Sequence, residues 1–178
     1  MDEIQELNQL LEDIKQNNLD SFDLLYEKTH KQVYLSILSI IKDTSLAEEI
    51  LQETYYKVLK YAKKYKKNTN VNNWIITIAR NEAKNTYNKR KRELQADPQE
   101  TEYLFSEAPD RNTPLLELMY SVLKENEIEL IILHVINNLT HKEIAKQLKK
   151  PIGTILWQYN QAIKKLKEKT GEMDERYQ

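Results

Sequence analysis

The chain has 178 residues and a formal net charge of −1, with 27 Lys or Arg residues set against 28 Asp or Glu residues. This length accommodates one ordinary domain or two small ones, each with a modest core. The absence of cysteine excludes disulfides, thiolate metal sites and cysteine nucleophiles. With only two glycines and four prolines, and with long apolar runs at helical spacing, the chain is predicted to be all-α.

The sequence offers no recognisable active site. The three histidines, His30, His134 and His141, lie far apart in the sequence, and none has a partner at metal-ligand spacing. Gly153 and Gly171 alone cannot build a phosphate-binding loop. We therefore expect no enzymatic activity, no metal and no cofactor.

The amino-terminal sequence bears on where the protein resides. It reads MDEIQE, which is acidic where a secretion signal is basic and then apolar, and no apolar run in the chain approaches membrane-spanning length. The prediction is a cytoplasmic protein without membrane insertion.

Two helices are predicted before residue 43 from the spacing of apolar residues, over about residues 4–14 and 20–42. A third helix is expected from residue 46 to about residue 63. Its start is predicted from Ser45 and Glu48, which have the spacing of a capping box.

Residues 63–73, KKYKKNTNVNN, are polar and basic and are expected to form mostly an exposed loop. A fourth helix is predicted to follow and to end in the basic run at residues 89–92. Trp74 shares the spacing of Ile75 and Ile78 on that helix, so packing in the core is its expected role.

Positive charge is concentrated around this loop. Residues 56–92 contain twelve Lys or Arg and one acidic residue, a net charge of +11, whereas residues 1–55 and 93–130 each carry −8 and residues 131–178 carry +4. A cationic surface of this strength is typical of proteins that bind polyanions. The alternative is a solvated lysine-rich helix face.

Residues 93–113 are acidic and aperiodic and contain Pro98 and Pro109, which indicates a linker. Four further helices are expected, at about residues 114–123, 127–136, 140–148 and 152–169, with Thr140 and Glu143 forming a second capping box. The predicted architecture is two small helical domains, 1–92 and 114–178, joined by the acidic linker 93–113.

The last two predicted helices have the pattern of a helix-turn-helix. Small Ala145 suits the point where the two helices approach closely, and Pro151 with Gly153 suits the start of the second helix. That second helix would enter the major groove of DNA. Because any small helical bundle can present two short helices, a purely structural role stays open.

Two blocks of sequence carry a family resemblance. The run SLAEEILQETYYKVLKY with the later WIITIARNEAKNTYNKRKRE resembles region 2 of bacterial RNA polymerase sigma factors, sigma-70 family, extracytoplasmic function (ECF) group, and NNLTHKEIAKQLKKPIGTI resembles region 4. Both blocks occur in the family's order and together span nearly the whole chain. The resemblance implies region 2 in residues 1–92, region 4 in residues 114–178, and promoter-specific transcription initiation with core RNA polymerase.

The resemblance also implies a surface that binds the polymerase. In the segment EILQE, Glu49, Gln52 and Glu53 are expected to face the coiled coil of the polymerase β′ clamp. An acidic stripe beside an apolar one suits a helix that docks on a basic coiled coil. The alternative is an ordinary solvated helix face.

Region 2 of this family opens the minus-ten promoter element and captures flipped bases, which needs cations for phosphates and polar or aromatic groups for unstacked bases. The loop and Asn81 are expected to contact bases, while Arg80, Lys84 and the terminal basic run hold phosphates. The residues expected at the minus-ten element are Lys63, Lys64, Tyr65, Lys66, Lys67, Asn68, Asn70, Asn73, Arg80, Asn81 and Lys84.

Region 4 implies contact with the minus-thirty-five element through the last helix. Here the sequence departs from the family, because relatives commonly place basic residues on the outward face and this chain has no cation from residue 151 until Lys164. A protein contact is an open alternative for Trp157. The residues expected at this element are Lys142, Lys150, Thr154, Trp157, Gln158, Gln161, Lys164 and Lys165.

The implied partners are core RNA polymerase, through its β′ clamp coiled coil and its β flap, promoter DNA, and an anti-sigma factor. Two other functions are open from the sequence. One is a free-standing helix-turn-helix regulator that uses only the carboxy-terminal unit. The other is a sigma-like protein that acts mainly through protein–protein interaction, which the weakly basic recognition face favours.

Overall fold

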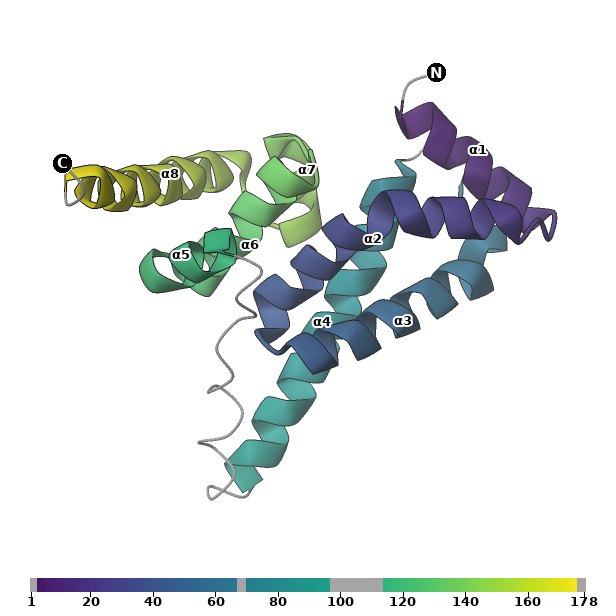
Figure 1. Cartoon of the computed structure of the whole chain (residues 1–178), viewed down its shortest axis with the longest axis horizontal. Coiled ribbons are helices and arrows are strands. Elements are labelled where there is room, and N and C mark those ends of the chain that lie inside the picture. The colour runs from purple at the N-terminus through teal and green to yellow at the C-terminus, as the bar shows by residue number, and fades with distance from the viewer. Residues whose placement is uncertain (1–2, 67–69, 97–113, 176–178) are drawn as a thin grey trace. The chain divides into compact units, whose positions relative to one another are not determined.

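The computed structural model describes residues 3–66, 70–96 and 114–175, and the regular secondary structure of these residues is helical (Figure 1). The chain divides into two compact units, Met1–Ser106 and Glu107–Gln178. The predicted all-α fold with two helical domains is confirmed. Within the described ranges, no helix combines the length and the apolar character needed to cross a membrane.

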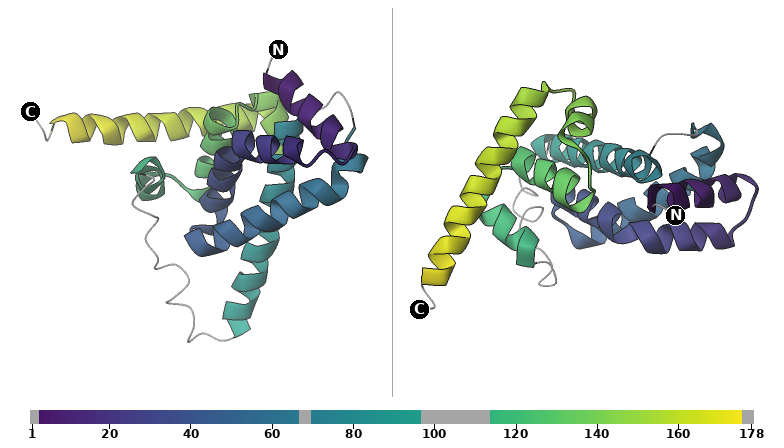
Figure 2. Two further views of the ribbon diagram at one scale, coloured as in Figure 1. Left: turned by 45° about the vertical axis from the view of Figure 1, so that its right-hand side comes forward. Right: turned by 90° about the horizontal axis from the view of Figure 1, so that it is seen from above.

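In the described residues of the first unit, the helices are α1 (Glu3–Lys15), α2 (Asp20–Ile41), α3 (Thr44–Tyr61) and α4 (Val71–Ala96), and a short 3-10 turn, η1 (Ala62–Lys64), follows α3. Helices α2, α3 and α4 pack against one another, and α1 lies against α2 and α4 (Figure 2). The largest fully buried side chains of this unit are Leu11, Leu25, Ile37, Leu38, Ile75 and Ile76. Because α4 continues to Ala96, the first residues of the predicted linker are helical.

A buried polar contact joins α3 to α2. The Thr29 hydroxyl donates to the carbonyl oxygen of Leu25 at 2.6 Å, so the Tyr55 hydroxyl, also 2.6 Å away, is the donor to Thr29 Oγ1. Burial raises the pKa of Tyr55 well above its usual range. The ring of Tyr55 also packs edge-on against Tyr26 and Phe22 of α2. This contact fixes which side of α3 faces inward.

Asp43, and not Ser45, caps the amino terminus of α3. The carboxylate of Asp43 accepts the backbone N–H of Leu46 at 2.8 Å, and its second oxygen accepts from Arg90 of α4 at 3.1 Å. The capping box predicted for Ser45 and Glu48 is therefore wrong, and both side chains are exposed. Asp43 takes this role because its backbone is extended, with φ −134° and ψ 117°, as an N-cap requires.

The second unit contains α5 (Pro114–Val122), α6 (Glu125–Ile131), the π-helical turn η3 (Ile132–Ile136), α7 (His141–Leu148) and α8 (Ile152–Glu175). Helices α5, α6 and α7 each pack against α8. The largest fully buried side chains here are Leu116, Met119, Ile128, Leu130, Ile132 and Leu133. The single helix predicted over residues 127–136 is thus divided into α6 and η3.

Helix α7 starts and ends as the helix-turn-helix pattern requires. Thr140 Oγ1 accepts the N–H of Glu143 at 3.3 Å while the Glu143 carboxylate accepts the N–H of Thr140 at 2.9 Å, so the predicted capping box is confirmed. At the other end Lys149 adopts the left-handed conformation, with φ 53°. The turn into α8 therefore depends on Lys149 rather than on Gly153, which lies in the first turn of α8 and does not have positive φ.

Replacement of Asp43 tests the observed cap. Asp43→Ala removes the cap and the ion pair with Arg90, so we expect the free energy of unfolding of the first unit to fall by about 1–2 kcal/mol. Ser45→Ala is the matched control and should change it by less than about 0.5 kcal/mol. Urea unfolding in a Trp157→Phe background measures both, because the chain has two tryptophans and Trp74 then reports on the first unit. Equal losses in the two variants would contradict the cap assignment.

Candidate nucleic-acid and protein interfaces

The outer side of α3 carries the residues predicted to bind polymerase. Glu49, Gln52 and Glu53 are all exposed, opposite the side of α3 that is buried against α2 and α4. Tyr56, with 58% of its surface exposed, continues this stripe by one helical turn, and Leu59 is 37% exposed. Neither residue is among those predicted to bind polymerase, although Tyr56 lies one helical turn after Gln52 and Leu59 one turn after Tyr56, and this spacing could have revealed both. We call Glu49, Gln52, Glu53 and Tyr56 the α3 stripe.

Lys57 connects the α3 stripe to α4. Its ammonium lies 2.6 Å from the Glu82 carboxylate and 3.4 Å from that of Glu53. The hydrogen bond to Glu82, with a smaller contribution from Glu53, raises the pKa of Lys57. Glu82 is the one acidic residue in the cationic stretch 56–92, and it is used in this link between helices. The Glu53 carboxylate can leave Lys57 and bind a cation of a partner protein at a small cost in free energy, because an exposed ion pair contributes only about 0–1 kcal/mol to stability.

Lysines at the end of α3 and after it form an exposed cationic group. Lys63, Lys64 and Lys66 are exposed, and the Lys64 ammonium lies 5.2 Å from the centre of the Tyr61 ring. Lys60 lies 5.7 Å from the same ring. Tyrosines alternate with lysines here, a combination that suits single-stranded nucleic acid because bases stack on aromatic rings and cations hold phosphates.

Tyr65 lies in the core, so the exposed loop predicted over residues 63–73 is wrong at this position. Tyr65 is 6% exposed, its hydroxyl donates to Asn8 Oδ1 at 2.9 Å, and its ring packs on Trp74 with centroids 5.1 Å apart. The ammonium of Lys15 lies 5.4 Å from the ring centre. Helix α1 therefore holds Tyr65 inward, and a direct contact of Tyr65 with bases would require this packing to open. Trp74 is half-buried, in agreement with its expected packing role.

The predicted residues of α4 divide into exposed and buried positions. Asn81 is exposed and Asn73 and Lys84 are half-buried, whereas Arg80 is only 5% exposed and interacts with other groups of the chain. Arg80 is buried because α4 packs against both α2 and α3, so a wide arc of its surface is covered. This burial corrects the expectation that Arg80 lies on the exposed face with Asn81. Asn70 accepts the N–H of Asn73 at 3.2 Å, which stabilises the start of α4.

Two residues expected at the minus-ten element, Lys67 and Asn68, lie outside the described residues. Their expected contacts stay predictions.

The outer face of α8 carries the residues predicted for the minus-thirty-five element. Trp157 is 64% exposed, Thr154 is exposed, and Gln158 and Gln161 are half-buried. Their spacing places these four side chains on one side of α8. On α7 and the following turn, Lys142 is exposed and Lys150 is half-buried.

Lys165 is occupied within the fold. Its ammonium donates to both carboxylate oxygens of Glu127, at 2.7 and 2.9 Å, and thereby joins α8 to α6. Burial alone would raise the pKa of Glu127, but the hydrogen bonds from Lys165 and from the N–H of Lys124 outweigh it, and the pKa is lowered. The expectation that Lys165 is available to a phosphate is therefore corrected. Lys164 stays exposed, with its ammonium 3.9 Å from Glu168.

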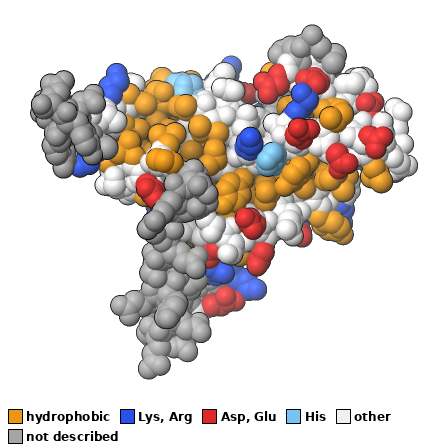
Figure 3. All heavy atoms as spheres, viewed as in Figure 1, with side chains coloured by type: hydrophobic (Ala, Val, Ile, Leu, Met, Phe, Trp, Pro, Cys, Tyr) orange, Lys and Arg blue, Asp and Glu red, His pale blue; other side chains and the backbone are white. Residues whose placement is uncertain are grey.

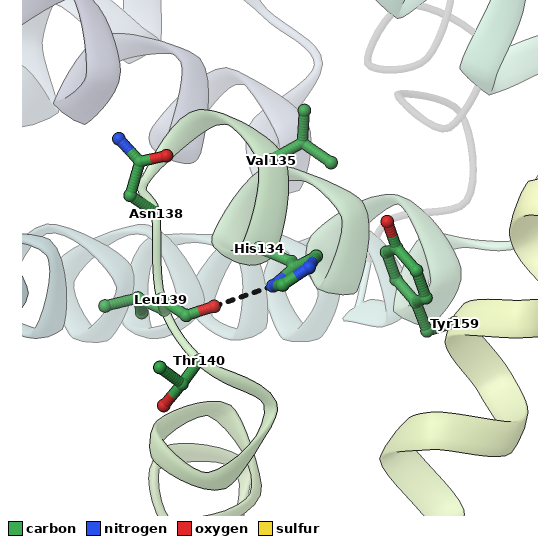
Figure 4. A pocket seen from close by; sticks show the side chains of 6 residues that line it. All are labelled: His134, Val135, Asn138, Leu139, Thr140 and Tyr159. Atoms are coloured by element: carbon green, nitrogen blue, oxygen red, sulfur yellow. Dashed lines mark hydrogen bonds between the residues drawn. The ribbon is translucent and has the colours of Figure 1, made fainter.

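His134, His141 and Tyr159 form a cluster that the sequence did not reveal. The two histidine ring centroids are 4.1 Å apart, and the Tyr159 ring lies edge-on to both. His134 Nδ1 donates to the carbonyl oxygen of Leu139 at 2.7 Å beside a cavity of about 310 Å³ (Figure 4). No group of three or more His, Cys, Asp or Glu side chains suited to a metal ion occurs in the described part of the chain.

The two units differ in the side chains that they show on the surface seen in Figure 3. On the face of the first unit in Figure 3, acidic side chains gather over α1 and α2, in keeping with the net charge of −8 of residues 1–55. On the second unit, the same view shows hydrophobic side chains gathered at the surface.

Comparison with known proteins gives a consistent family. Residues 25–93 match the family model of sigma-70 region 2. The chain is 29% identical over 129 residues to the ECF RNA polymerase sigma factor SigM of Bacillus subtilis (strain 168), which covers 69% of this chain and 78% of that protein. It is 24% identical over 161 residues to the RNA polymerase sigma factor CarQ of Myxococcus xanthus, which covers 87% of this chain and 92% of that protein.

Solved structures share the fold. The sigma factor RpoE of Bartonella quintana, solved in complex with the anti-sigma factor NepR, superposes with a TM-score of 0.68 at 22% identity, covering 83% of this chain and 94% of that one. CnrH, solved in complex with the cytosolic domain of CnrY, gives a TM-score of 0.67 at 14% identity, covering 94% and 98%. The match over residues 25–93 identifies sigma-70 region 2 in this chain, and the solved structures share its fold. The region 2 match and the similarity to SigM together support a sigma-70 family factor of the ECF group.

The histidine cluster predicts a pH-dependent stability of the second unit. Burial lowers the pKa of His141, and the nearby His134 lowers it further. Since an unfolded histidine titrates near about 6.5, the unfolded chain takes up a proton before the folded unit does. The contribution of neutral His141 to the free energy of unfolding is therefore fully present above a pH of about 6.5. This contribution is lost as the pH falls through the lower pKa that His141 has in the folded unit.

Hydrogen exchange of the α7 amides between pH 5 and 7.5 measures this effect. After correction for the intrinsic exchange rate, we expect the protection of α7 to decrease toward pH 5 in the wild-type chain and to vary much less in His141→Gln. His30→Gln, in the first unit, is the control and should behave as the wild type. An unchanged pH profile in His141→Gln would show that another group causes the loss.

Proposed function

We propose that this chain is a cytoplasmic transcription initiation factor that binds core RNA polymerase and directs it to specific promoters, without catalytic activity of its own. The observation that carries the proposal is the composition of the unit that matches sigma-70 region 2. This unit presents the acidic α3 stripe on one helix, and a cationic group of Lys63, Lys64 and Lys66 follows the same helix. A protein-docking surface and a polyanion-binding surface are thus built into one small bundle.

The α3 stripe is the proposed contact with the β′ clamp coiled coil. Its carboxylates, Glu49 and Glu53, suit a basic partner helix, because complementary charge fixes the register of two docking helices. Tyr56, 58% exposed, supplies the aromatic group that protein interfaces commonly use as an anchor. The buried contact between Tyr55 and Thr29 supports this surface, because it holds α3 in the rotation that directs the stripe outward.

The minus-ten element is the proposed ligand of the cationic group and the adjoining face of α4. Lys63, Lys64 and Lys66 would hold the phosphates of the separated strand, and Asn81 would contact a base. The packed pair of Tyr65 and Trp74 supports the proposal in a different way than the sequence predicted. The two rings pack against each other, and the neighbouring Lys64 and Lys66 are exposed.

Helix α8 is the proposed reader of the minus-thirty-five element, and we infer that the second unit also contacts the β flap. An anti-sigma factor is a further proposed partner, since RpoE of Bartonella quintana was solved with one and shares this fold.

A sigma-like protein that only sequesters polymerase is the second candidate function. The observation that favours it is the recognition face of α8, which exposes Trp157 and has no cation from residue 151 until Lys164.

Charge reversal in the α3 stripe tests docking. Glu49→Lys combined with Glu53→Lys replaces attraction to a basic coiled coil by repulsion, so we expect affinity for purified core polymerase to fall by at least about tenfold. Glu27→Lys with Glu3→Lys reverses the same number of exposed charges on α2 and α1 and serves as the control. Co-elution titrated against core polymerase measures both. If the charge reversal in the α3 stripe leaves the affinity for core polymerase unchanged, the alternative function of a free-standing helix-turn-helix regulator is favoured.

Neutralisation of the cationic group tests strand separation. Lys66→Ala with Lys67→Ala removes phosphate contacts, so we expect open-complex formation to fall by about tenfold or more while core binding is unchanged. Lys28→Ala with Lys31→Ala, on α2, is the matched control. The measurements are permanganate footprinting and run-off transcription on a template that the wild-type holoenzyme has selected from randomised DNA. Core binding by the wild type without a transcript on any selected template would establish the sequestering protein instead.

A further inference from the structure

We infer that α8 reads an upstream element composed of A·T base pairs, with Gln158 and Gln161 on adenines and Trp157 on thymine methyl groups. This inference rests on the proposed function, because it requires α8 to enter the major groove. It assigns the base composition of the element and the residues that select it.

The fold presents these residues together. Ile155 and Ala162 are fully buried against the rest of the second unit, which fixes the rotation of α8. At 3.6 residues per turn, Trp157, Gln158 and Gln161 then share the outward side within about one turn of each other. They lie in the first part of α8, and the amino-terminal residues of a recognition helix are those that reach base edges.

This face lacks the side chains that commonly read guanine. Guanine presents two acceptors in the major groove, N7 and O6, and a forked Arg or Lys contact is its usual reader. The sequence has neither residue from position 151 until Lys164. Lys165, the next cation, donates both short hydrogen bonds to Glu127 and is held toward α6. A G·C pair facing Trp157, Gln158 and Gln161 would therefore find no cationic partner for its acceptors among residues 151–163.

Adenine is the base that the two glutamines match. It presents an acceptor and a donor side by side, N7 and the N6 amino group, and a primary amide offers the complementary donor and acceptor. Within the described residues, no hydrogen bond engages the side chains of Gln158 or Gln161. Binding to adenine would therefore break no contact of the folded unit. Guanine would satisfy the amide donor but leave the amide oxygen unpaired.

Thymine is the base that the exposed apolar groups match. Trp157 is 64% exposed, and Ile152 and Leu156 on the adjoining side of α8 are 49% and 42% exposed. The C5 methyl group of thymine is the apolar feature of the major groove. An indole that closes over this methyl group removes apolar surface of both partners from water. Thymine paired to each contacted adenine places methyl groups where such contacts form.

Selection of DNA by the holoenzyme tests the composition. Core polymerase carrying the full wild-type chain is challenged with duplexes randomised over a promoter-length window, and the retained sequences are read. We expect an upstream block in which the pairs protected by α8 are A·T. An upstream block dominated by G·C at the protected pairs would overturn the inference while leaving the proposed function intact. Failure to bind core, or retention without any enriched sequence, would instead overturn the proposed function.

Variants and modified bases test the residue roles on the selected duplex. Gln158→Ala and Gln161→Ala should each weaken binding by about tenfold and relax the preference for adenine at one position. Replacing thymine by deoxyuridine in the upstream block removes only methyl groups, and should weaken wild-type binding by about threefold at each contacted base. Replacing thymine by deoxyuridine should not weaken DNA binding by the Trp157→Ala variant any further.

Asn160→Ala is the matched control, because Asn160 is an exposed amide on the same helix but lies about 100° around the axis from Gln161. It should leave base preference unchanged. Circular dichroism confirms that each variant is folded.

If Trp157→Ala is as sensitive to deoxyuridine as the wild type and binds core polymerase more weakly, Trp157 is a protein contact and its assigned role is wrong. If both glutamine variants select the same sequence as the wild type, the reading of adenine is overturned.

Discussion

The rotation of α3 about its own axis is the constraint on which the first unit depends. A helix buried on one side can present its other side to a partner only if that rotation is fixed. Here the Tyr55 hydroxyl is bonded to Thr29 of α2, and Asp43 links the start of α3 to Arg90 of α4. Lys57 adds a second link to α4 through Glu82. A shift of one residue in this packing would turn the α3 stripe inward and expose apolar side chains in its place.

Helical periodicity was sufficient to predict the α-helices of the described residues, although α6 was predicted together with η3 as one helix. The two-unit organisation was predicted from the acidic, proline-containing segment 93–113. The local capping box of Thr140 and Glu143 was equally accessible, because both partners lie within one turn. The cap of α3 was not accessible in this way, since Ser45 has the capping-box spacing with Glu48, whereas Asp43, which is also a common N-cap residue type, is followed three positions later by Leu46. What decides between them is the extended backbone of Asp43 and its tertiary partner Arg90.

The remaining errors concern residues whose surroundings come from several helices at once. Tyr65 belongs to a lysine-rich segment, yet α1 and Trp74 enclose it. Arg80 follows the polar side of α4 in a simple helical projection, but α4 is covered from two directions and that position is buried. His134 and His141 meet because η3 and α7 are in contact, and the spacing of the two histidines in the sequence gives no sign that their rings lie together.

The ion pair between Lys165 and Glu127 has a consequence for how the two units respond to ionic strength. A lysine that is bonded within the protein releases no counterion when DNA arrives, so it adds nothing to the salt dependence of binding, whereas each phosphate neutralised by a lysine contributes about 0.9 to its logarithmic slope. If the proposed function holds, the cationic stretch of the first unit would carry a large share of that slope, while the neutral outer face of α8 would contribute little. Rising salt would thus weaken attachment through the first unit sooner than base reading through the second, and would sharpen discrimination between promoters as total affinity declines.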